Sequence, residues 1–268
     1  MYNIKEVDNL KYLTFPSLEK QNDLFHCFTT RYGGVSEGCF SSMNLALVTN
    51  DDMKNVYKNY EILCEKLSLN QHDMVRTYQT HTANIRYATD EDKGKFFDEI
   101  PGYIDVDGLI TDKKNIALTT CHGDCTPIYF YDPIKKIIGM AHAGWKGTVQ
   151  NIAGNMVKKF KNDFNSNSKD IITVIGPSLC QSCFEVDEDV KDVFIDTDIN
   201  FKNYMIAKGK KYHFDLWEIN KYLMMQEGIL AENIEISRLC TKCNNDMFFS
   251  HRGQKGMRGL MIGIIMIK

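Results

Sequence analysis

Three stretches of the chain carry apolar residues at helical spacing, with polar capping residues at their boundaries. Residues 51–70 begin at an aspartate and place their apolar side chains on one face. Residues 148–164 show the same spacing. Residues 215–228 begin at Asp215 and end at Gly228, the residue types that usually bound a helix. The sequence therefore predicts three amphipathic helices.

Shorter apolar runs lie between these helices and predict strands, because they are rich in β-branched and aromatic residues and are bounded by turn residues. The predicted strands and extended segments are 26–31, 74–89, 126–131, 136–143, 170–178, 234–239 and 259–268. A short turn joins the third and fourth of these runs into a hairpin, which argues against a purely parallel sheet. We expect one α+β domain over residues 1–268, with mixed, largely antiparallel sheets flanked by helices.

The hairpin predicted within residues 121–145 brings a cysteine and a histidine together. Its turn contains an aspartate followed by a proline, which suits a type I turn. If the turn closes Asp132 onto Lys135, Cys125 lies directly opposite His142. Opposed side chains share one face of the sheet, with Cβ atoms about 4.5–5.5 Å apart, and this separation suits two ligands of one metal ion.

His81 is the best candidate for a third ligand, because it lies on the polar, extended stretch 74–89. Two imidazoles and a thiolate are a common ligand set for catalytic zinc and leave a fourth position open for water or substrate. The same donors suit copper. His122 is an alternative third ligand because it lies between Cys121 and Cys125. A different interpretation, in which these residues belong to the core, also fits the spacing.

Composition and charge bear on the partners and the compartment. The 268 residues carry a formal net charge of −3, which gives no reason to expect a nucleic-acid or membrane partner. The N-terminal residues lack the basic and apolar segments of a signal peptide, and the closing apolar run is too short to span a bilayer. Nine cysteines without such a signal suggest a reducing compartment, so we expect a cytoplasmic protein.

Six motifs occur in one order along the chain. They read YQTHTANI, DGLIT, GDCTPIYFYDP, HAGWKGTVQNI, IGPSLCQSCFEVDEDV and CTKCNNDMFFSHRGQKGMRG. In this order they resemble the YfiH-like family, which carries the older labels "laccase domain" and "polyphenol oxidase" and is now described as purine nucleoside phosphorylases. The resemblance runs from about Phe28 to the C-terminus and implies a single α+β domain with mixed sheets.

The resemblance implies a zinc ion bound by the histidine of Gln-x-His, the cysteine of Asp-Cys-x-Pro and the histidine of His-Ala-Gly-Trp, here His81, Cys125 and His142. It implies cleavage of adenosine, inosine and methylthioadenosine with phosphate to the free base and (methylthio)ribose 1-phosphate, with adenosine deaminase side activity. Purine nucleosides and phosphate are the implied partners. The chain departs from the family at 250–252, Ser-His-Arg instead of Ser-Tyr-Arg, and at 255–259, where Thr-Gly-Arg is usual. Substrate preference is expected to differ if this segment shapes the sugar pocket.

Five further residues are candidates for catalysis or for binding substrate. Asp124, beside the cysteine ligand, is a candidate catalytic group that handles a proton or supports the metal, with a turn cap as the alternative. Arg31 lies next to two glycines and is a candidate catalytic cation for phosphate, with a solvated turn arginine as the alternative. Candidates for binding substrate or phosphate are Lys146, which precedes a helix start, Asn44 and Arg252.

Two Cys-x-x-Cys pairs, Cys180 with Cys183 and Cys240 with Cys243, have the ligand type of a structural zinc site. The gap between the pairs far exceeds the roughly 15–20 residues that are usual in zinc ribbons. We therefore expect buried free thiols, with a second metal site as the alternative.

A zinc-dependent purine nucleoside phosphorylase with deaminase side activity is the function that we expect. One alternative is a copper-dependent phenol oxidase, which matches the older family label. Multicopper sites need many histidines, often in His-x-His pairs, and the chain has seven histidines and no such pair. This argues against a multicopper oxidase and leaves an enzyme with a single copper ion as the alternative. Another alternative is a non-catalytic zinc-binding module, which a fourth protein ligand on the ion would favour.

Overall fold

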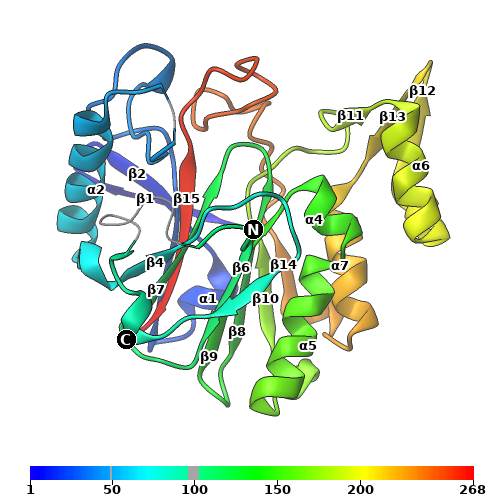
Figure 1. Ribbon diagram of the computed structural model, residues 1–268, viewed down its shortest axis with the longest axis horizontal. Coiled ribbons are helices and arrows are strands. Elements are labelled where there is room, and N and C mark those ends of the chain that lie inside the picture. The colour runs from blue at the N-terminus through cyan, green and yellow to red at the C-terminus, as the bar shows by residue number, and fades with distance from the viewer. Residues whose placement is uncertain (49, 96–102) are drawn as a thin grey trace.

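The computed structural model describes residues 1–48, 50–95 and 103–268. Over these residues two six-stranded sheets form the body of the fold, and a small third sheet projects at one side (Figure 1). The strands of the first sheet are, in spatial order, β1 (Asn3–Val7), β2 (Leu10–Thr14), β3 (Leu24–Thr29), β15 (Met261–Ile267), β7 (Ala117–His122) and β4 (Met74–Arg76). Those of the second sheet are β14 (Ile234–Ile236), β10 (Ile172–Ile175), β8 (Thr126–Asp132), β9 (Ile137–Ala143), β6 (Gly108–Thr111) and β5 (Ile85–Tyr87). Those of the third are β11 (Glu185–Val186), β13 (Lys211–Phe214) and β12 (Met205–Lys208).

Helices connect these strands and cover the sheets. The α-helices in the described residues are α1 (Pro16–Glu19), α2 (Met53–Leu67), α4 (Trp145–Val149), α5 (Ile152–Phe164), α6 (Glu188–Thr197) and α7 (Leu216–Gln226). Short 3-10 turns lie at Gly38–Phe40, Gln71–Asp73, Asp90–Asp92, Ser168–Asp170, Ile199–Tyr204 and Ala231–Asn233. None of the helices in the described part of the chain has both the length and the hydrophobicity needed to cross a lipid bilayer.

Strand direction in the two large sheets is mixed. Parallel pairs occur at the edges, where β4 joins β7, β5 joins β6 and β14 joins β10. The inner pairs, including β8 with β9 and β15 with both β3 and β7, are antiparallel. The expected α+β fold with mixed, largely antiparallel sheets is confirmed.

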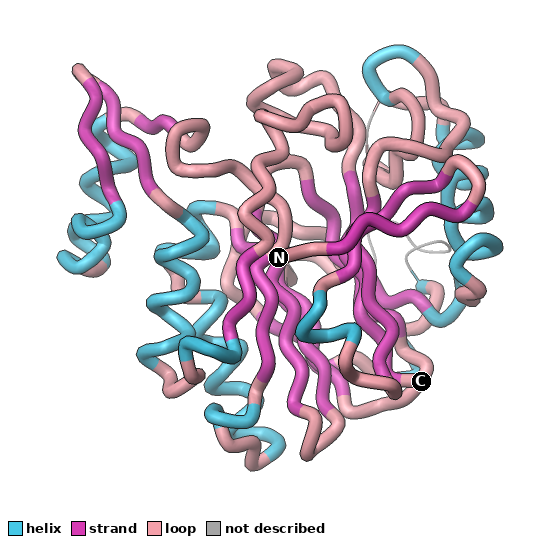
Figure 2. Tube along the Cα trace, turned by 180° about the vertical axis from the view of Figure 1, so that it is seen from behind, coloured by secondary structure: helices cyan, strands magenta, loops and turns pink. Residues whose placement is uncertain are grey.

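The two large sheets pack face to face, and helices cover the outer face of each (Figures 1 and 2). Along β8, Ile128 and Phe130 pack against α5 and α7, whereas Tyr129 and Tyr131 pack toward the first sheet. The outer face of the first sheet is covered by α2. Because the central strands are buried on both faces, they read as continuous apolar runs instead of alternating patterns.

One predicted helix, 148–164, is wrong in its extent. The chain forms α4 and then α5, with a break between them. Asn151 adopts a left-handed backbone with φ of 62°, and its side-chain oxygen accepts a hydrogen bond from Gly154 N at 3.0 Å, which caps α5. The other two predicted helices are confirmed as α2 and α7, capped by the side chains of Asp52 and Asp215.

The predicted extended stretch 74–89 contains only the short strands β4 and β5, with an irregular loop between them. Neither α6 nor the β12–β13 hairpin is among the elements predicted from the sequence. In α6 only Phe194 is fully buried, so the helix lacks the broad apolar face that would have revealed it.

Candidate metal centre and adjoining cavities

One ligand atom from each of His81, Cys125 and His142 lies within 4.8 Å of the other two. Cys125 Sγ is 3.7 Å from His81 Nε2. His142 is nearly fully buried, Cys125 is partly buried and His81 is exposed. The fold thus brings together the three residues that the sequence analysis selected as metal ligands, and it leaves one side of the group open.

The hairpin that delivers two of these residues differs from its predicted register. His142 pairs with Pro127, not with Cys125, because the turn closes Asp132 onto Ile137. The predicted register is therefore wrong by two residues. A shift of two residues leaves every side chain on its original face, since side chains alternate with a period of two. Cys125, one residue before β8, consequently still faces the same side as His142.

The loop between β4 and β5 carries His81 and is fixed to the first sheet. The side chain of Gln79 donates from Nε2 to the carbonyl of Cys121 at 2.9 Å and accepts from the N–H of Cys121 at 2.7 Å. His81 itself has a left-handed backbone with φ of 68°. The glutamine of the Gln-x-His motif therefore anchors the loop, and the histidine projects from it.

Asp107 holds the centre together, although the sequence analysis did not select it. Its fully buried carboxylate accepts hydrogen bonds from the backbone N–H groups of Thr80, His81 and Thr82 at 3.1, 3.0 and 2.8 Å. It also accepts from His142 Nδ1 at 2.7 Å. With Nδ1 occupied, His142 presents Nε2 to a metal. The Asp-Gly-Leu-Ile-Thr motif begins at this aspartate, which is the sequence signal that could have identified it.

The electrostatics favour an ionised cysteine. Burial alone raises the pKa of the Cys125 thiol, but the charge of His142 and hydrogen bonds from His142 and His81 outweigh burial and lower this pKa to about 6. Burial likewise lowers the pKa of His142, but the Cys125 thiolate and Asp107 outweigh burial and raise this pKa to about 9. Both shifts favour a thiolate and an imidazolium in the metal-free centre, and a metal ion that binds His142 must displace its proton.

Gly144, at the start of α4, is in close contact with the centre. A Cβ at this position would lie 2.6 Å from His81 Cδ2 and 3.2 Å from Cys125 Sγ. The backbone φ of −67° at Gly144 suits any residue. The glycine of the His-Ala-Gly-Trp motif is therefore required by space and not by backbone conformation.

We expect Gly144→Ala to weaken zinc binding at this centre by at least about 10-fold, because the new methyl group displaces His81. Competition with a chromophoric chelator measures the affinity. Gly209→Ala is the control for a destabilising alanine remote from the centre, since Gly209 lies in the β12–β13 turn, where a Cβ meets nothing within 4 Å and the cost comes only from the left-handed backbone with φ of 61°. Unchanged zinc affinity in Gly144→Ala would contradict the steric argument.

His122, the alternative third ligand, is occupied by other contacts. It is fully buried, and its ring nitrogens contact Thr120 Oγ1 at 2.8 Å and the Cys125 carbonyl at 3.1 Å. Its ring centroid lies 5.3 Å from that of His142. His122 therefore packs beneath the centre and supports the backbone of Cys125.

Two cavities adjoin the centre. One has a volume of about 230 Å³ and the other about 340 Å³, and both are lined by His81, Cys125 and Arg258 among other residues. The larger cavity also has the aromatic side chains of Trp145 and Phe184 in its wall. An apolar wall beside a cluster of polar and charged groups is typical of a small-molecule site.

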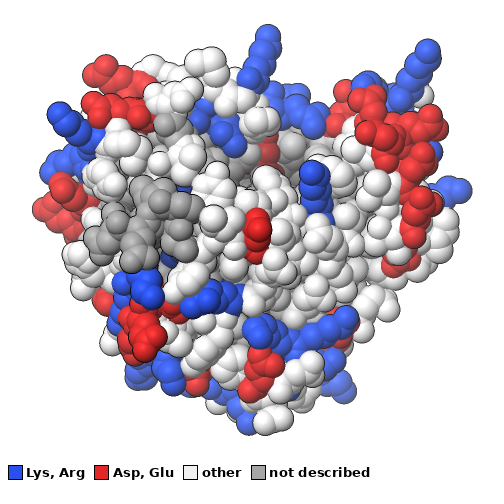
Figure 3. Space-filling model, in the orientation of Figure 1, with Lys and Arg blue, Asp and Glu red and all other residues white. Residues whose placement is uncertain are grey.

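Arg258 is the cation that both cavities share, and the sequence analysis did not select it. Its Nε is buried without a hydrogen-bond partner. Burial lowers the pKa of this guanidinium, and the nearby charges of Asp124 and Cys125 act in the opposite direction. In Figure 3, basic side chains gather at the upper centre of the face, where the loop before β15 runs. Arg258 lines both cavities, so its guanidinium is a candidate group for binding an anion there.

Asp124 and Arg252 meet at the wall of the larger cavity. Asp124 has φ of 95°, and its carboxylate accepts from Thr241 Oγ1 and from the backbone N–H of Arg252, both at 2.6 Å. The guanidinium of Arg252 donates to the Glu185 carbonyl at 3.0 Å. Asp124 therefore connects three loops that surround the cavity.

The remaining candidates line neither of these two cavities. Arg31 donates to the backbone carbonyls of Ser41 and Asn245, both at 2.8 Å, and braces two loops. Asn44 is fully buried, and its side-chain oxygen accepts from Leu260 N at 3.0 Å. Lys146 is exposed on α4. The described contacts of Arg31 and Asn44 are thus structural.

The expectation of buried free thiols in the Cys-x-x-Cys pairs is wrong in part. The four cysteines form no disulfide, but only Cys240 is buried, Cys180 and Cys183 are partly exposed, and Cys243 is exposed. The four sulfur atoms lie within 4.8 Å of one another. The fold therefore contains a second candidate metal site.

Comparison with known proteins extends these observations. Residues 25–268 match the family model described as "Multi-copper polyphenol oxidoreductase laccase". The chain is 38% identical over 244 residues to "Purine nucleoside phosphorylase YlmD" of Bacillus subtilis, covering 90% of this chain and 87% of that protein. Its fold matches the crystal structure of the hypothetical protein YfiH of Bacillus licheniformis with a TM-score of 0.92 and 35% identity, over 99% of both chains. It also matches YlmD of Geobacillus stearothermophilus with a TM-score of 0.90 and 31% identity, over 98% of both chains.

Proposed function

The chain belongs to the YfiH/YlmD laccase-domain family, and from this premise we propose that it is a purine nucleoside phosphorylase acting at the His81, Cys125 and His142 centre. The observation that carries the proposal is the convergence of these three ligands beside two cavities that share Arg258. A purine nucleoside and phosphate are the substrates that such a site must hold together.

The donor set fits zinc. Two imidazoles and one thiolate, with a buried carboxylate on one imidazole, form a typical catalytic zinc site. Among the described residues the group contains three protein ligands, whereas structural zinc sites usually have four, which supports an enzyme over a non-catalytic module. Zinc, when bound, supplies a Lewis acid that polarises a substrate oxygen or lowers the pKa of water.

Other residues of the chain orient the metal ligands and bind the two substrates. Asp107 orients His142 and fixes the loop that carries His81. Trp145 offers an aromatic face to a purine in the larger cavity. Arg258 offers a guanidinium to phosphate. We propose adenosine, inosine and methylthioadenosine as substrates, with the free base and (methylthio)ribose 1-phosphate as products.

Incubation of the zinc-loaded protein with each nucleoside, with and without phosphate, tests this function. We expect free base and ribose 1-phosphate only when phosphate is present. Conversion of adenosine to inosine without phosphate would demonstrate the deaminase side activity that we propose. Zinc-loaded protein that forms no sugar phosphate from any of the three nucleosides would refute the phosphorylase.

A copper-dependent phenol oxidase is the second candidate, favoured by the description of the matching family model and by the donor set, which also suits copper. The His81, Cys125 and His142 group offers ligands for one ion. Metal analysis of protein purified without added metal separates the two candidates. Copper in place of zinc, with oxygen consumption on phenols, would favour the oxidase.

Removal of Arg258 is expected to impair the use of phosphate. Arg258→Ala loses a charge-assisted hydrogen bond of about 2 kcal/mol, so we expect the KM for phosphate to rise by about 30-fold. The KM for adenosine is expected to change much less. Lys255→Ala removes one exposed positive charge from the same loop and serves as the control. Equal increases in the KM for phosphate in the two variants would show that Arg258 contributes only positive charge to the loop and makes no direct contact with phosphate.

A further inference from the structure

The two Cys-x-x-Cys turns meet because two parallel strands lead into them. β10 and β14 are parallel neighbours in the second sheet. Each strand continues for a few residues before its turn, and the chains stay paired there. Ser178 N donates to the Leu239 carbonyl, and Thr241 N donates to the Ser178 carbonyl, both at 3.1 Å. The two Cys-x-x-Cys turns, which are far apart in the sequence, are therefore close in space.

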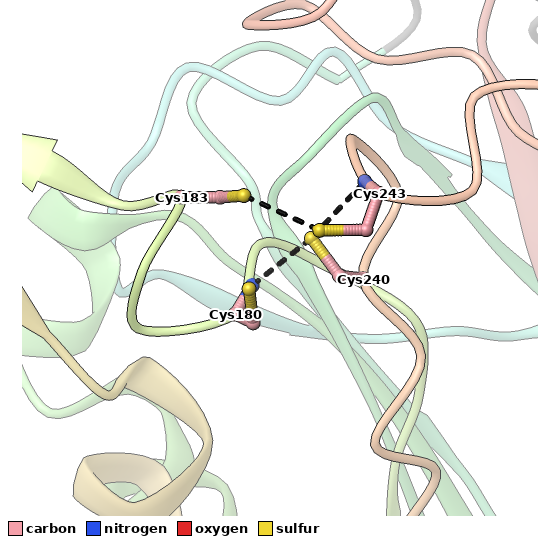
Figure 4. A group of neighbouring side chains, drawn as sticks. All are labelled: Cys180, Cys183, Cys240 and Cys243. Carbon is pink, nitrogen blue, oxygen red and sulfur yellow. Dashed lines mark hydrogen bonds between the residues drawn. The ribbon is translucent and has the colours of Figure 1, made fainter.

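The sulfur atoms of the two turns face one another (Figure 4). Cys183 Sγ lies 3.5 Å from Cys243 Sγ, and all four sulfurs lie within 4.8 Å of one another. In a tetrahedral zinc site with Zn–S bonds of about 2.3 Å, neighbouring sulfurs are about 3.8 Å apart. The observed separations match one shared ion. An iron–sulfur cluster distributes four thiolates over several irons and needs a wider spacing.

Backbone N–H groups are directed at one of these sulfurs. Cys180 N and Cys243 N lie 3.4 and 3.5 Å from Cys240 Sγ and donate to it. Hydrogen bonds of this kind stabilise a thiolate and orient it as a ligand. Each cysteine pair therefore lies in a turn whose backbone supports the sulfur of Cys240.

The cysteine cluster lies behind the wall of the larger cavity. Leu179 and Phe184, on either side of the first pair, line that cavity. Thr241, inside the second pair, donates to the Asp124 carboxylate, which also accepts from Arg252 N. A bond between the two turns therefore fixes two separate parts of the cavity wall.

We propose that Cys180, Cys183, Cys240 and Cys243 bind one structural zinc ion, distinct from the His81, Cys125 and His142 centre, and that this ion holds together two loops that form the wall of the larger cavity. Tetrahedral four-thiolate sites closed to solvent ligands are structural. Zinc binds such a site more tightly than ferrous iron does. The site goes beyond the proposed phosphorylase function and does not depend on it.

Metal counting in the Cys125→Ser variant tests this site without altering it. We expect about two zinc ions per chain in the unmodified protein and about one in Cys125→Ser. X-ray absorption of the zinc left in Cys125→Ser should show four sulfur neighbours at about 2.3 Å and no nitrogen. Cys39→Ser, which changes a cysteine outside both groups, is the control and should keep about two.

A second variant, Cys183→Ser combined with Cys243→Ser, is expected to keep about one zinc, with nitrogen and sulfur neighbours, and to melt at a lower temperature. Cys125→Ser protein free of zinc, iron in place of zinc, or a Cys183–Cys243 disulfide in protein purified with reductant would overturn the proposal. A Cys125→Ser protein that keeps its sulfur-bound zinc would support it even if the unmodified protein cleaves no nucleoside.

Discussion

Cys125→Ser is expected to lower kcat/KM for phosphorolysis of adenosine by more than about 100-fold, because it removes a direct ligand, and the loss of residues that merely support ligands already costs about 10–100-fold. Serine has the shape of cysteine and is only slightly smaller, so the hairpin between β8 and β9 is expected to fold normally. Its hydroxyl does not ionise near neutral pH, whereas the surroundings of Cys125 lower the pKa of the thiol to about 6. The substitution therefore removes the anionic donor and leaves only His81 and His142.

Steady-state kinetics and zinc analysis on the same protein preparation measure this effect. Cys39→Ser is the matched control, since Cys39 is a free cysteine that belongs to neither candidate metal group. Loss of zinc from the centre together with loss of activity is the expected result. Full activity in a Cys125→Ser protein that has lost this zinc would show that phosphorolysis does not need the metal.

The sequence predicts the ligands of this centre better than it predicts the structure that carries them. The motif resemblance and the hairpin argument both select His81, Cys125 and His142, and the fold brings them together. The hairpin register is nevertheless wrong by two residues, because the turn closes Asp132 onto Ile137 and is longer than predicted. The N–H groups of Ile134 and Lys135 donate to the Asp132 side chain and stabilise this longer turn. The prediction that Cys125 and His142 lie on the same face of the sheet is still correct, because an even shift preserves the alternation of side chains.

Contacts between segments far apart in the chain explain what the sequence analysis missed. The motif that begins at Asp107 marks this residue, but its role depends on the loop after β4 folding over it, and the motif does not predict that contact. The two cysteine pairs are too far apart in the sequence for a zinc ribbon, and only the parallel pairing of β10 with β14 brings them close enough for one ion. Arg258 appeared only as part of a departure from the family pattern, and its unpartnered nitrogen is visible only in the folded chain. Local periodicity carries no information about such long-range neighbours.

Asp107→Asn is expected to weaken zinc binding by about 10–100-fold and to lower the stability of the protein, although the two side chains have the same shape. In the native protein both carboxylate oxygens accept hydrogen bonds. Oδ1 accepts from His142 Nδ1 and His81 N, and Oδ2 accepts from Thr80 N and Thr82 N. An amide must place its NH₂ group against one of these pairs of donors. Each buried donor left without an acceptor costs about 1–3 kcal/mol.

The orientation of the amide in Asp107→Asn decides whether zinc binding or the loop that carries His81 is affected more. With NH₂ toward His142, the imidazole can accept at Nδ1 only as the tautomer that carries its proton on Nε2, and that nitrogen can then no longer bind a metal. With NH₂ toward Thr80 and Thr82, the loop that holds His81 loses its anchor. Burial alone raises the pKa of Asp107, but hydrogen bonds from His142 and Thr82 outweigh burial and lower this pKa, so the native group is a carboxylate. Both orientations therefore remove an interaction that the centre needs.

Asp105→Asn is the matched control for this prediction, because Asp105 is exposed in the same loop and accepts from the Thr80 hydroxyl at 2.6 Å, a bond that an amide oxygen can keep. Chelator competition measures the zinc affinity, and thermal unfolding of the metal-free proteins separates the stability effect from the loss of metal. We expect Asp105→Asn to match the unmodified protein in both measurements. An Asp107→Asn protein with native zinc affinity would mean that the tautomer of His142 is fixed by something other than this carboxylate and that Asp107 does not hold the centre together.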